Sequence, residues 1–413
     1  MGLRRPAIVF FALTFLTLNV SAEDASKNAT STERVGMVFA PKGRNTMSLL
    51  QSCLIILLSC TYTVLHLNIP APHESIWDLC KRKLKWTFVT LIAPEVTCSV
   101  AFRQWEESRA VVKEMRRRGI NWTPIHGFYA TMGGFVLHHS DGSKIPLLPS
   151  ELLLLLDAPG KCPLQLPPIK EIDIEDRNKT SGFTKLFTLT QVTWLVGQCI
   201  LRGAANLPIS QLEVTTVAFA ACTIMASGFW WSKPLDVRMT TPVHYSGPLP
   251  REVVTSTKGW KTRAELQRVK MTTRIVRRGS RRSMFFNLAL PFFLFSTVFS
   301  VLHLIAWDFD FATILERDLW RVCSLVATFM PVVIAGFLQM ASIWDSSIHA
   351  NPGAKRRIKA PEFAALVILF YFLSVAAYVA ARMILIFQVF YSLRSMPVGI
   401  YNTIPWTNYI PHI

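Results

Sequence analysis

The sequence predicts an all-α integral membrane protein: a six-span helical bundle with a small irregular cytosolic block and an N-terminal signal peptide. The first observation is composition, because 51% of the 413 residues are apolar and only 17% are charged, against about 25% charged residues in an ordinary soluble domain. The second is a mean hydropathy of +0.33. The third is a set of apolar segments near the length of about 20 residues that a helix needs to cross a bilayer. These observations exclude a disordered chain, a collagen and a small disulfide scaffold.

The first 22 residues are predicted to be a signal peptide. Two arginines precede a short apolar run, 7–20, which ends in small residues at Ala22, and this order is typical of a secretory leader. An uncleaved membrane anchor is the alternative. After cleavage, residues 23–46 form a lumenal N-terminal segment, and Asn28 in the sequon Asn-Ala-Thr becomes a glycosylation site.

The spans are predicted to be helices, because a bilayer interior requires each segment to satisfy its own backbone hydrogen bonds. Six segments qualify: 47–67, 183–205, 213–231, 285–306, 319–341 and 363–390. A seventh apolar segment, 86–102, is short and contains Pro94 and Glu95. A helix there is expected to break and restart at the proline.

Loop charges orient the spans, because cytosolic loops collect Lys and Arg. The loop 232–284 carries 13 basic and three acidic residues, whereas 307–318 is acidic, so we place the first in the cytosol and the second in the lumen. Both flanks of 86–102 are basic. We therefore predict that 86–102 is re-entrant or interfacial, and seven true spans are the alternative.

This topology divides the chain into successive parts. They are the signal peptide 1–22, the lumenal segment 23–46, the first span with the re-entrant segment 47–102, the cytosolic block 103–182, a hairpin of two spans 183–231, the basic cytosolic loop 232–284, three spans 285–390 and a lumenal tail 391–413. The net charge of +18 follows from the cytosolic loops, so the expected partners are the lipid bilayer and a lipophilic small molecule, and no nucleic acid is expected.

The cytosolic block contains two local signals. Asp141-Gly142 predicts a β-hairpin turn, and the leucine-rich stretch 151–157 is too short to span and predicts an interfacial or core helix. Asn121 and Asn178 head two further sequons, which this topology leaves unmodified because they face the cytosol.

Motifs for cofactors and metals are missing from the sequence. The eight cysteines form no CxxC pair, and we find no carboxylate cluster at metal-ligand spacing, nucleotide fingerprint or nucleophile elbow. We therefore expect no cofactor and no metal.

Polar residues at membrane depth are candidate functional residues, because they are costly to bury there. Glu95 is either a shielded proton donor or a carboxylate stabilised at a helix N-terminus. Arg202 and Glu213 are separated by a short turn, and we expect them to form either a structural ion pair or the polar cap of a pocket. Arg382, within the last span, is expected to snorkel or pair. A polar stripe at helical spacing is predicted to face the bundle interior: Gln191, Trp194, Gln198 and Arg202.

Several stretches together resemble a family. They are Leu91-Ile-Ala-Pro-Glu95, 122–137 with its His-Gly-Phe-Tyr-Ala-Thr-Met-Gly-Gly-Phe core, 191–213, and Trp230-Trp-Ser-Lys-Pro-Leu-Asp236. Across most of residues 47–390 the chain is similar to a large group of filamentous-fungal multi-pass membrane proteins. The resemblance implies a fungal source and no assigned general function, with some members beside secondary-metabolite genes. It transfers no catalytic residue.

Three classes of function fit these residues. One is an endomembrane enzyme, a cyclase or isomerase for a lipophilic and prenylated metabolite, with Glu95 and Glu213 as acids and with Trp194, Trp230 and Trp231 lining the pocket. A second is a transporter or export helper for such a metabolite. The third is a non-catalytic membrane scaffold or receptor. The signal peptide places all three in the secretory pathway, in the endoplasmic reticulum or the plasma membrane.

Overall fold

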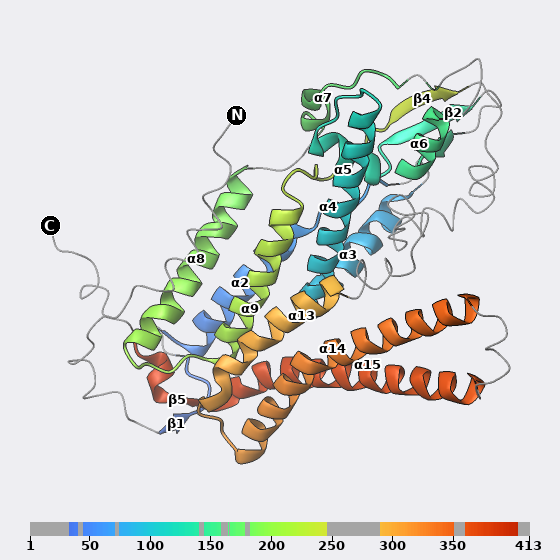
Figure 1. Ribbon diagram of the computed structural model, residues 1–413. Helices are drawn as coiled ribbons and strands as arrows, with labels where there is room; N and C mark the ends of the chain where they lie inside the picture. Colours follow the sequence, from blue (N-terminus) through green and yellow to red (C-terminus); the bar gives the residue numbers. More distant parts are fainter. Residues whose placement is uncertain are drawn as a thin grey trace.

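The computed structural model describes residues 33–39, 44–70, 74–139, 144–157, 164, 166–177, 182–245, 290–350 and 360–403. The predicted signal peptide, Asn28 and most of the basic loop 232–284 lie outside these residues. Within them, long helices form a bundle, and a small unit with a β-sheet lies at one end of it (Figure 1).

The bundle confirms an α-helical membrane architecture. Its long helices are α2 (Thr46–Val64), α8 (Gly182–Ala204), α9 (Gln211–Phe229), α13 (Leu290–His303, continued by the 3-10 helix η3, Leu304–Asp308), α14 (Ile314–Ala350) and α15 (Ala360–Tyr391). Among the described residues, all of them except α8 contain a stretch long and apolar enough to cross a membrane, which makes five candidate spans. The segment predicted at 183–205 is therefore helical as expected, but it is more polar than the other five.

Helix α9 lies at the centre of the bundle. In its span 56% of the residues are buried, against 22% in the span of α15, and it packs against α2, α4, α8 and α13. The outward face of α15 exposes apolar side chains, among them Leu369, Phe372 and Phe387. Lipid is the medium in which such a face is stable.

The segment predicted to be re-entrant forms two helices that meet at a break. Helix α3 (Ile76–Ile92) ends at Ala93, and α4 (Pro94–Arg117) begins with the proline at its first position, where the missing N–H costs no helical hydrogen bond. The two helices run in different directions from this point, which lies near α13 in the bundle (Figure 1). The expected break at Pro94 is confirmed.

The unit at the end of the bundle, which we call the sheet unit, consists of the described residues within 118–177 and of residues 236–245. It holds α5 (Pro124–Thr131), β2 (Phe135–His139), β3 (Lys144–Pro146), α6 (Pro149–Leu156), α7 (Glu171–Glu175) and β4 (Thr241–Tyr245). Strands β2 and β3 are antiparallel, which confirms the predicted hairpin, while the turn residues Asp141 and Gly142 lie outside the described residues. The leucine-rich stretch is α6, which packs into the core of this unit.

One strand of this sheet comes from a distant part of the sequence. Strand β4 follows α9 and pairs in parallel with β2, which gives the order β3-β2-β4. The start of the predicted basic loop is thus built into the sheet unit rather than being a separate loop. Val243 lies in the same core as Leu137 and Leu152, so burial of alternate side chains holds this strand in place.

Two glycines in the 122–137 stretch are required by packing. A Cβ on Gly134 would lie 2.4 Å from the ring of Tyr129, and a Cβ on Gly127 would lie 2.7 Å from the backbone oxygen of Ser108. Both contacts are far inside van der Waals distance. The glycines of this stretch therefore bring α5 against α4 and the tyrosine against β2.

The two ends of the described chain meet at the opposite end of the bundle from the sheet unit (Figure 1). Strand β1 (Arg34–Val35) pairs antiparallel with β5 (Met396–Pro397), which lies between the 3-10 helices η5 (Ser392–Arg394) and η6 (Val398–Tyr401). The N-terminal segment and the C-terminal tail therefore lie on the same side of the bundle.

Candidate functional site

A group of polar side chains in the middle of the bundle centres on Glu95, the second residue of α4. Its side chain is fully buried, and one carboxylate oxygen, Oε1, accepts a hydrogen bond of 2.6 Å from the hydroxyl of Tyr378. That hydroxyl lies 2.8 Å from Oγ of Ser296 on α13. The guanidinium of Arg382 lies 3.6 Å from the other carboxylate oxygen, Oε2. We call Glu95, Ser296, Tyr378 and Arg382 the core polar cluster.

The helix break positions this cluster. Arg382 donates a hydrogen bond of 2.8 Å to the carbonyl of Ile92, at the end of α3, where the partial charge of the helix dipole is negative. Glu95 lies in the first turn of α4, where that partial charge is positive. Thr90 and Thr97 hydrogen-bond across the break at 2.8 Å. Each half-helix end therefore holds the charge that its dipole favours.

Aromatic rings pack against the cluster. The guanidinium of Arg382 lies 4.1 Å from the centre of the Phe299 ring, and Phe292 contacts the ring of Tyr378 edge-on. A low local dielectric strengthens every electrostatic interaction in such a place.

Two atoms of the cluster keep unused hydrogen-bonding capacity. Within the part of the chain that the structure describes, Oε2 of Glu95 and Nε of Arg382 are buried without a hydrogen-bond partner. Buried polar atoms nearly always have partners, so each exception requires an explanation. The arrangement offers an acceptor carboxylate and a donor phenol side by side, which is the combination that proton transfer requires.

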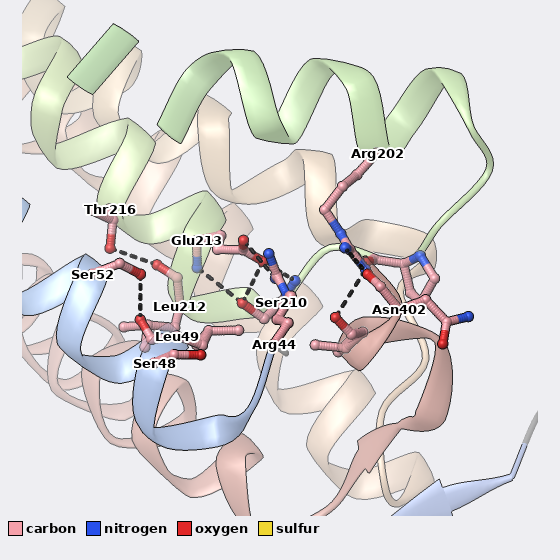
Figure 2. Close-up of polar contacts among 12 residues, drawn as sticks. Arg44, Ser48, Leu49, Ser52, Arg202, Ser210, Leu212, Glu213, Thr216 and Asn402 are labelled. Carbon is pink, nitrogen blue, oxygen red and sulfur yellow. Dashed lines mark hydrogen bonds and ion pairs between the residues drawn. The ribbon is translucent and has the colours of Figure 1, made fainter. Parts of the chain in front are cut away.

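The second sequence candidate, Glu213, lies in a different cluster near the paired termini. Its carboxylate binds Arg44 at 2.7 Å and accepts hydrogen bonds from the backbone and the hydroxyl of Ser210 at 3.0 and 2.9 Å. Ser210 in turn caps α9 by accepting from the Glu213 amide. This is a capping box with a cation attached, and Figure 2 shows the three side chains together.

The expected direct ion pair between Arg202 and Glu213 is wrong. Arg202 is fully buried and points instead toward the C-terminal tail (Figure 2). All three of its nitrogens donate to backbone carbonyls at 2.8–3.0 Å: those of Pro208, Gly399, Ile400 and Asn402. The turn after α8 and the tail supply so many carbonyls that the guanidinium needs no carboxylate.

The predicted polar stripe of α8 does not face the bundle interior as a whole. Trp194 is 54% exposed, whereas Val192 and Leu195 are buried against α2 and α9. Gln191 and Gln198 are half-buried at the margins of that apolar face. Burial of hydrocarbon determined the orientation of α8, and of the stripe only Arg202 lies fully inside.

The tryptophan pair after α9 is divided between surface and interior. Trp231 is 64% exposed with Lys185 over its ring, whereas Trp230 is buried and donates to Gln104 on α4. The predicted pocket wall of Trp194, Trp230 and Trp231 is therefore not assembled, since Trp194 and Trp231 both lie on the surface.

Lys233 forms a third buried cluster where the bundle meets the sheet unit. Its ammonium donates to the carbonyl of His66, to Asn68 at 3.1 Å and to Gln104 at 2.7 Å, and it lies over the ring of Trp230. Burial lowers the pKa of Lys233 well below its usual range. Burial, with a smaller effect of the Lys233 charge, also lowers the pKa of His66 to about 4.

Sequence reasoning identified Glu95 and expected Arg382 to snorkel or pair, but it missed Tyr378 and Ser296. A signal was present, because Tyr378 lies four residues before Arg382 in the last span, so the two share one helix face. Among the described residues, no three His, Cys, Asp or Glu side chains come together as a metal site.

The fold and this cluster define a helical multi-pass membrane protein with an ionisable site in its core. The chain belongs to a family of unknown function, DUF8562, whose family model matches residues 11–247 and 288–413. The core polar cluster lies within the matched residues. Comparisons with curated proteins and with solved structures found no match.

Proposed function

We propose that the protein crosses the bilayer six times, and that α8 is a span in addition to the five candidate spans. Because β1 pairs with β5, the chain between them must cross an even number of times, and five candidate spans leave one crossing to assign. Helix α8 packs along α2 and α9, so we assign the remaining crossing to it. Helices α3 and α4 enter the membrane and leave it on the same side, so together they add no crossing. The paired termini then lie on the lumenal side, and the sheet unit lies in the cytosol.

This orientation implies that the protein enters the secretory pathway by a signal peptide and resides in the endoplasmic reticulum or the plasma membrane. It also implies that Asn28 faces the lumen and carries a glycan. Deglycosylation of the purified protein tests it: we expect a mobility shift that Asn28→Gln abolishes. A shift that survives this substitution and disappears in Asn121→Gln would place the sheet unit in the lumen and overturn the topology.

For the chemistry, we propose an acid–base enzyme of the isomerase type that acts on a lipophilic small molecule of secondary metabolism. The observation that supports it is the hydrogen-bonded chain from Ser296 through Tyr378 to Glu95, beside Arg382, in an apolar core. Such a site provides proton transfer without a cofactor.

The sequence-based expectation was that Glu95 is the catalytic acid, but the hydrogen bonds favour a different assignment of acid and base. Glu95 accepts a hydrogen bond from Tyr378 and faces a guanidinium, so it acts as the base. Its Oε2, which accepts no hydrogen bond within the described residues, meets the substrate. Tyr378 acts as the acid. Glu95 removes a proton from an acidic carbon, Tyr378 delivers one elsewhere on the substrate, and the proton on Glu95 then returns to Tyr378 along their hydrogen bond. We assign Glu213 and Arg202 to structure.

Gene deletion and complementation test this proposal. Cells and medium are extracted separately and compared by untargeted mass spectrometry after reintroduction of wild type, Tyr378→Phe or Tyr371→Phe, with equal protein amounts verified. We expect the deletion and Tyr378→Phe to accumulate one compound at the expense of an isomer of identical mass. Tyr371, on the same helix at the margin of the core, is the matched control and should restore the wild-type profile.

The broken helix supports a second candidate, a transporter. Helices interrupted at membrane depth hold substrates of many transporters between their half-helix ends, and Ala93–Pro94 is such an interruption. In the same experiment, transport predicts that a compound stays unchanged but moves between cells and medium. An unchanged metabolite profile would overturn both proposals and leave a scaffold or receptor.

A further inference from the structure

Helix α3 exposes a large apolar face although it is not one of the candidate spans. Ile76 is 79% exposed, Trp77 77%, Leu84 68% and Phe88 65%. At about 100° per residue these positions lie within one arc of the helix, together with the exposed Cys80. A contiguous exposed face of this kind marks an interaction surface.

Two other basic residues of the same helix form ion pairs within the protein. Arg82 is buried and lies 3.4 Å from Glu74, and Lys83 binds Asp236 at 2.8 Å. Lys81 and Lys85 differ from them, because both are exposed and lie one turn apart along the edge of the apolar arc. Neither forms an ion pair with another residue of the described ranges.

The position of α3 determines what covers this face. Its last carbonyl, that of Ile92, binds Arg382 of the α15 span, so the C-terminal end of α3 lies at membrane depth. Its N-terminal half lies toward the sheet unit (Figure 1). The apolar arc therefore meets the bilayer, and the two lysines at its edge lie where phospholipid head groups begin. An apolar arc edged by cations is the pattern by which helices bind an anionic membrane surface.

We propose that the outer face of α3 is a binding surface for anionic phospholipid, with acyl chains along Leu84 and Phe88, the phosphate beside Lys81 and Lys85, and the Trp77 ring at the level of the head groups. Each lysine near an anionic surface enriches such lipids about five-fold, which corresponds to about 1 kcal/mol. The surface is separate from the core polar cluster and is independent of the proposed reaction.

The exposed Cys80 gives a direct test with the full-length protein. Cys162 lies outside the described residues, so it is replaced by Ser, and a maleimide fluorophore is attached to Cys80. The labelled protein is reconstituted into phosphatidylcholine vesicles that contain equal fractions of either brominated phosphatidylserine or brominated phosphatidylcholine. We expect the phosphatidylserine to quench the probe at least two-fold more strongly, and we expect Lys81→Gln/Lys85→Gln to equalise the two.

The control double variant Lys113→Gln/Lys170→Gln removes two exposed lysines elsewhere and should retain the preference. Cys80→Ser reports background labelling. Equal quenching by the two lipids in the otherwise unaltered protein would overturn the anionic-lipid site. A probe that neither lipid quenches would show that protein covers this face, and it would overturn the proposal as well.

Discussion

Arg202 and Arg382 are both buried within the helical bundle, but their surroundings differ. Arg202, near the paired termini, donates five hydrogen bonds of 2.8–3.0 Å to backbone carbonyls, and its three nitrogens are all used. Arg382, in the middle, makes one such bond, to Ile92, and its Nε has no hydrogen-bond partner within the described ranges. Its carboxylate neighbour Glu95 lies 3.6 Å away and is also incompletely bonded.

This difference separates structural from functional polar groups. At the two ends of the bundle, the nitrogens of Arg202 are all bonded to carbonyls and the ammonium of Lys233 is bonded to three acceptors, and groups bonded in this way hold segments in place. In the middle, charges are paired but retain free donors and acceptors, which is costly unless something else uses them. The middle is therefore where we place the chemistry, and the ends are where we expect the largest losses of stability.

The largest expected effect is that of Arg202→Met. It removes the guanidinium donor from four backbone carbonyls, two of which belong to the buried residues Gly399 and Ile400, and it releases the tail from α8, so we expect a loss of about 3–5 kcal/mol in unfolding free energy. Thermal unfolding in detergent and protease sensitivity of residues 391–403 measure it. Arg394→Met is the control on the same tail, because it removes a partly exposed pair with Glu316, and it should cost less than about 1 kcal/mol. Equal losses of unfolding free energy in the two variants would contradict the role of Arg202 in holding the tail against α8.

A charge-removal cycle tests the middle. Glu95→Gln strands the guanidinium of Arg382 in an apolar core, and we expect it to cost about 2–4 kcal/mol, whereas Glu95→Gln/Arg382→Gln removes both charges and regains most of this loss. Apparent melting temperatures of wild type, Glu95→Gln, Arg382→Gln and the double variant give the coupling. Additive losses would show that the two charges do not act as a pair.

The end near the sheet unit is expected to be sensitive to acid through His66. Its pKa of about 4 in the folded protein lies below the usual 6.5, so between these values the unfolded state binds more protons and stability falls as the pH is lowered. At pH 5 the expected loss is about 2 kcal/mol. Melting temperatures at pH 7 and pH 5 measure it, and the loss should shrink in His66→Gln but persist in the control His138→Gln, which alters a half-buried histidine of the sheet unit. An equal loss in His66→Gln and wild type would exclude His66 as its source.

The sequence was sufficient to predict features that depend on local composition or on a single turn-forming motif. Five of the six expected spans, the break at Pro94 and the hairpin between β2 and β3 follow from runs of apolar residues, a proline and Asp-Gly. The partners of the buried charges did not follow, because they join segments far apart in the sequence. Glu95 meets Tyr378 across 283 positions, and Arg202 meets the tail across about 200. The orientation of α8 was also missed, since a polar stripe and an apolar stripe compete there and packing favoured the apolar one.

The smallest expected effect tests how closely the tail must approach Arg202. A Cβ on Gly399 would lie 2.9 Å from the ring of Pro208, and since the carbonyls of both residues accept from Arg202, the tail must shift slightly away from the guanidinium. We expect Gly399→Ala to cost about 1 kcal/mol. Gly197→Ala is the matched control, because nothing lies within 4 Å of its Cβ position in α8, and it should be neutral or stabilising as alanine is favoured over glycine inside helices. If Gly399→Ala and Gly197→Ala have the same unfolding free energy, the tail has room to move without loss of stability. The five hydrogen bonds of Arg202 would then not require the close packing of Gly399 on Pro208, and the contrast with Arg382 would be weaker.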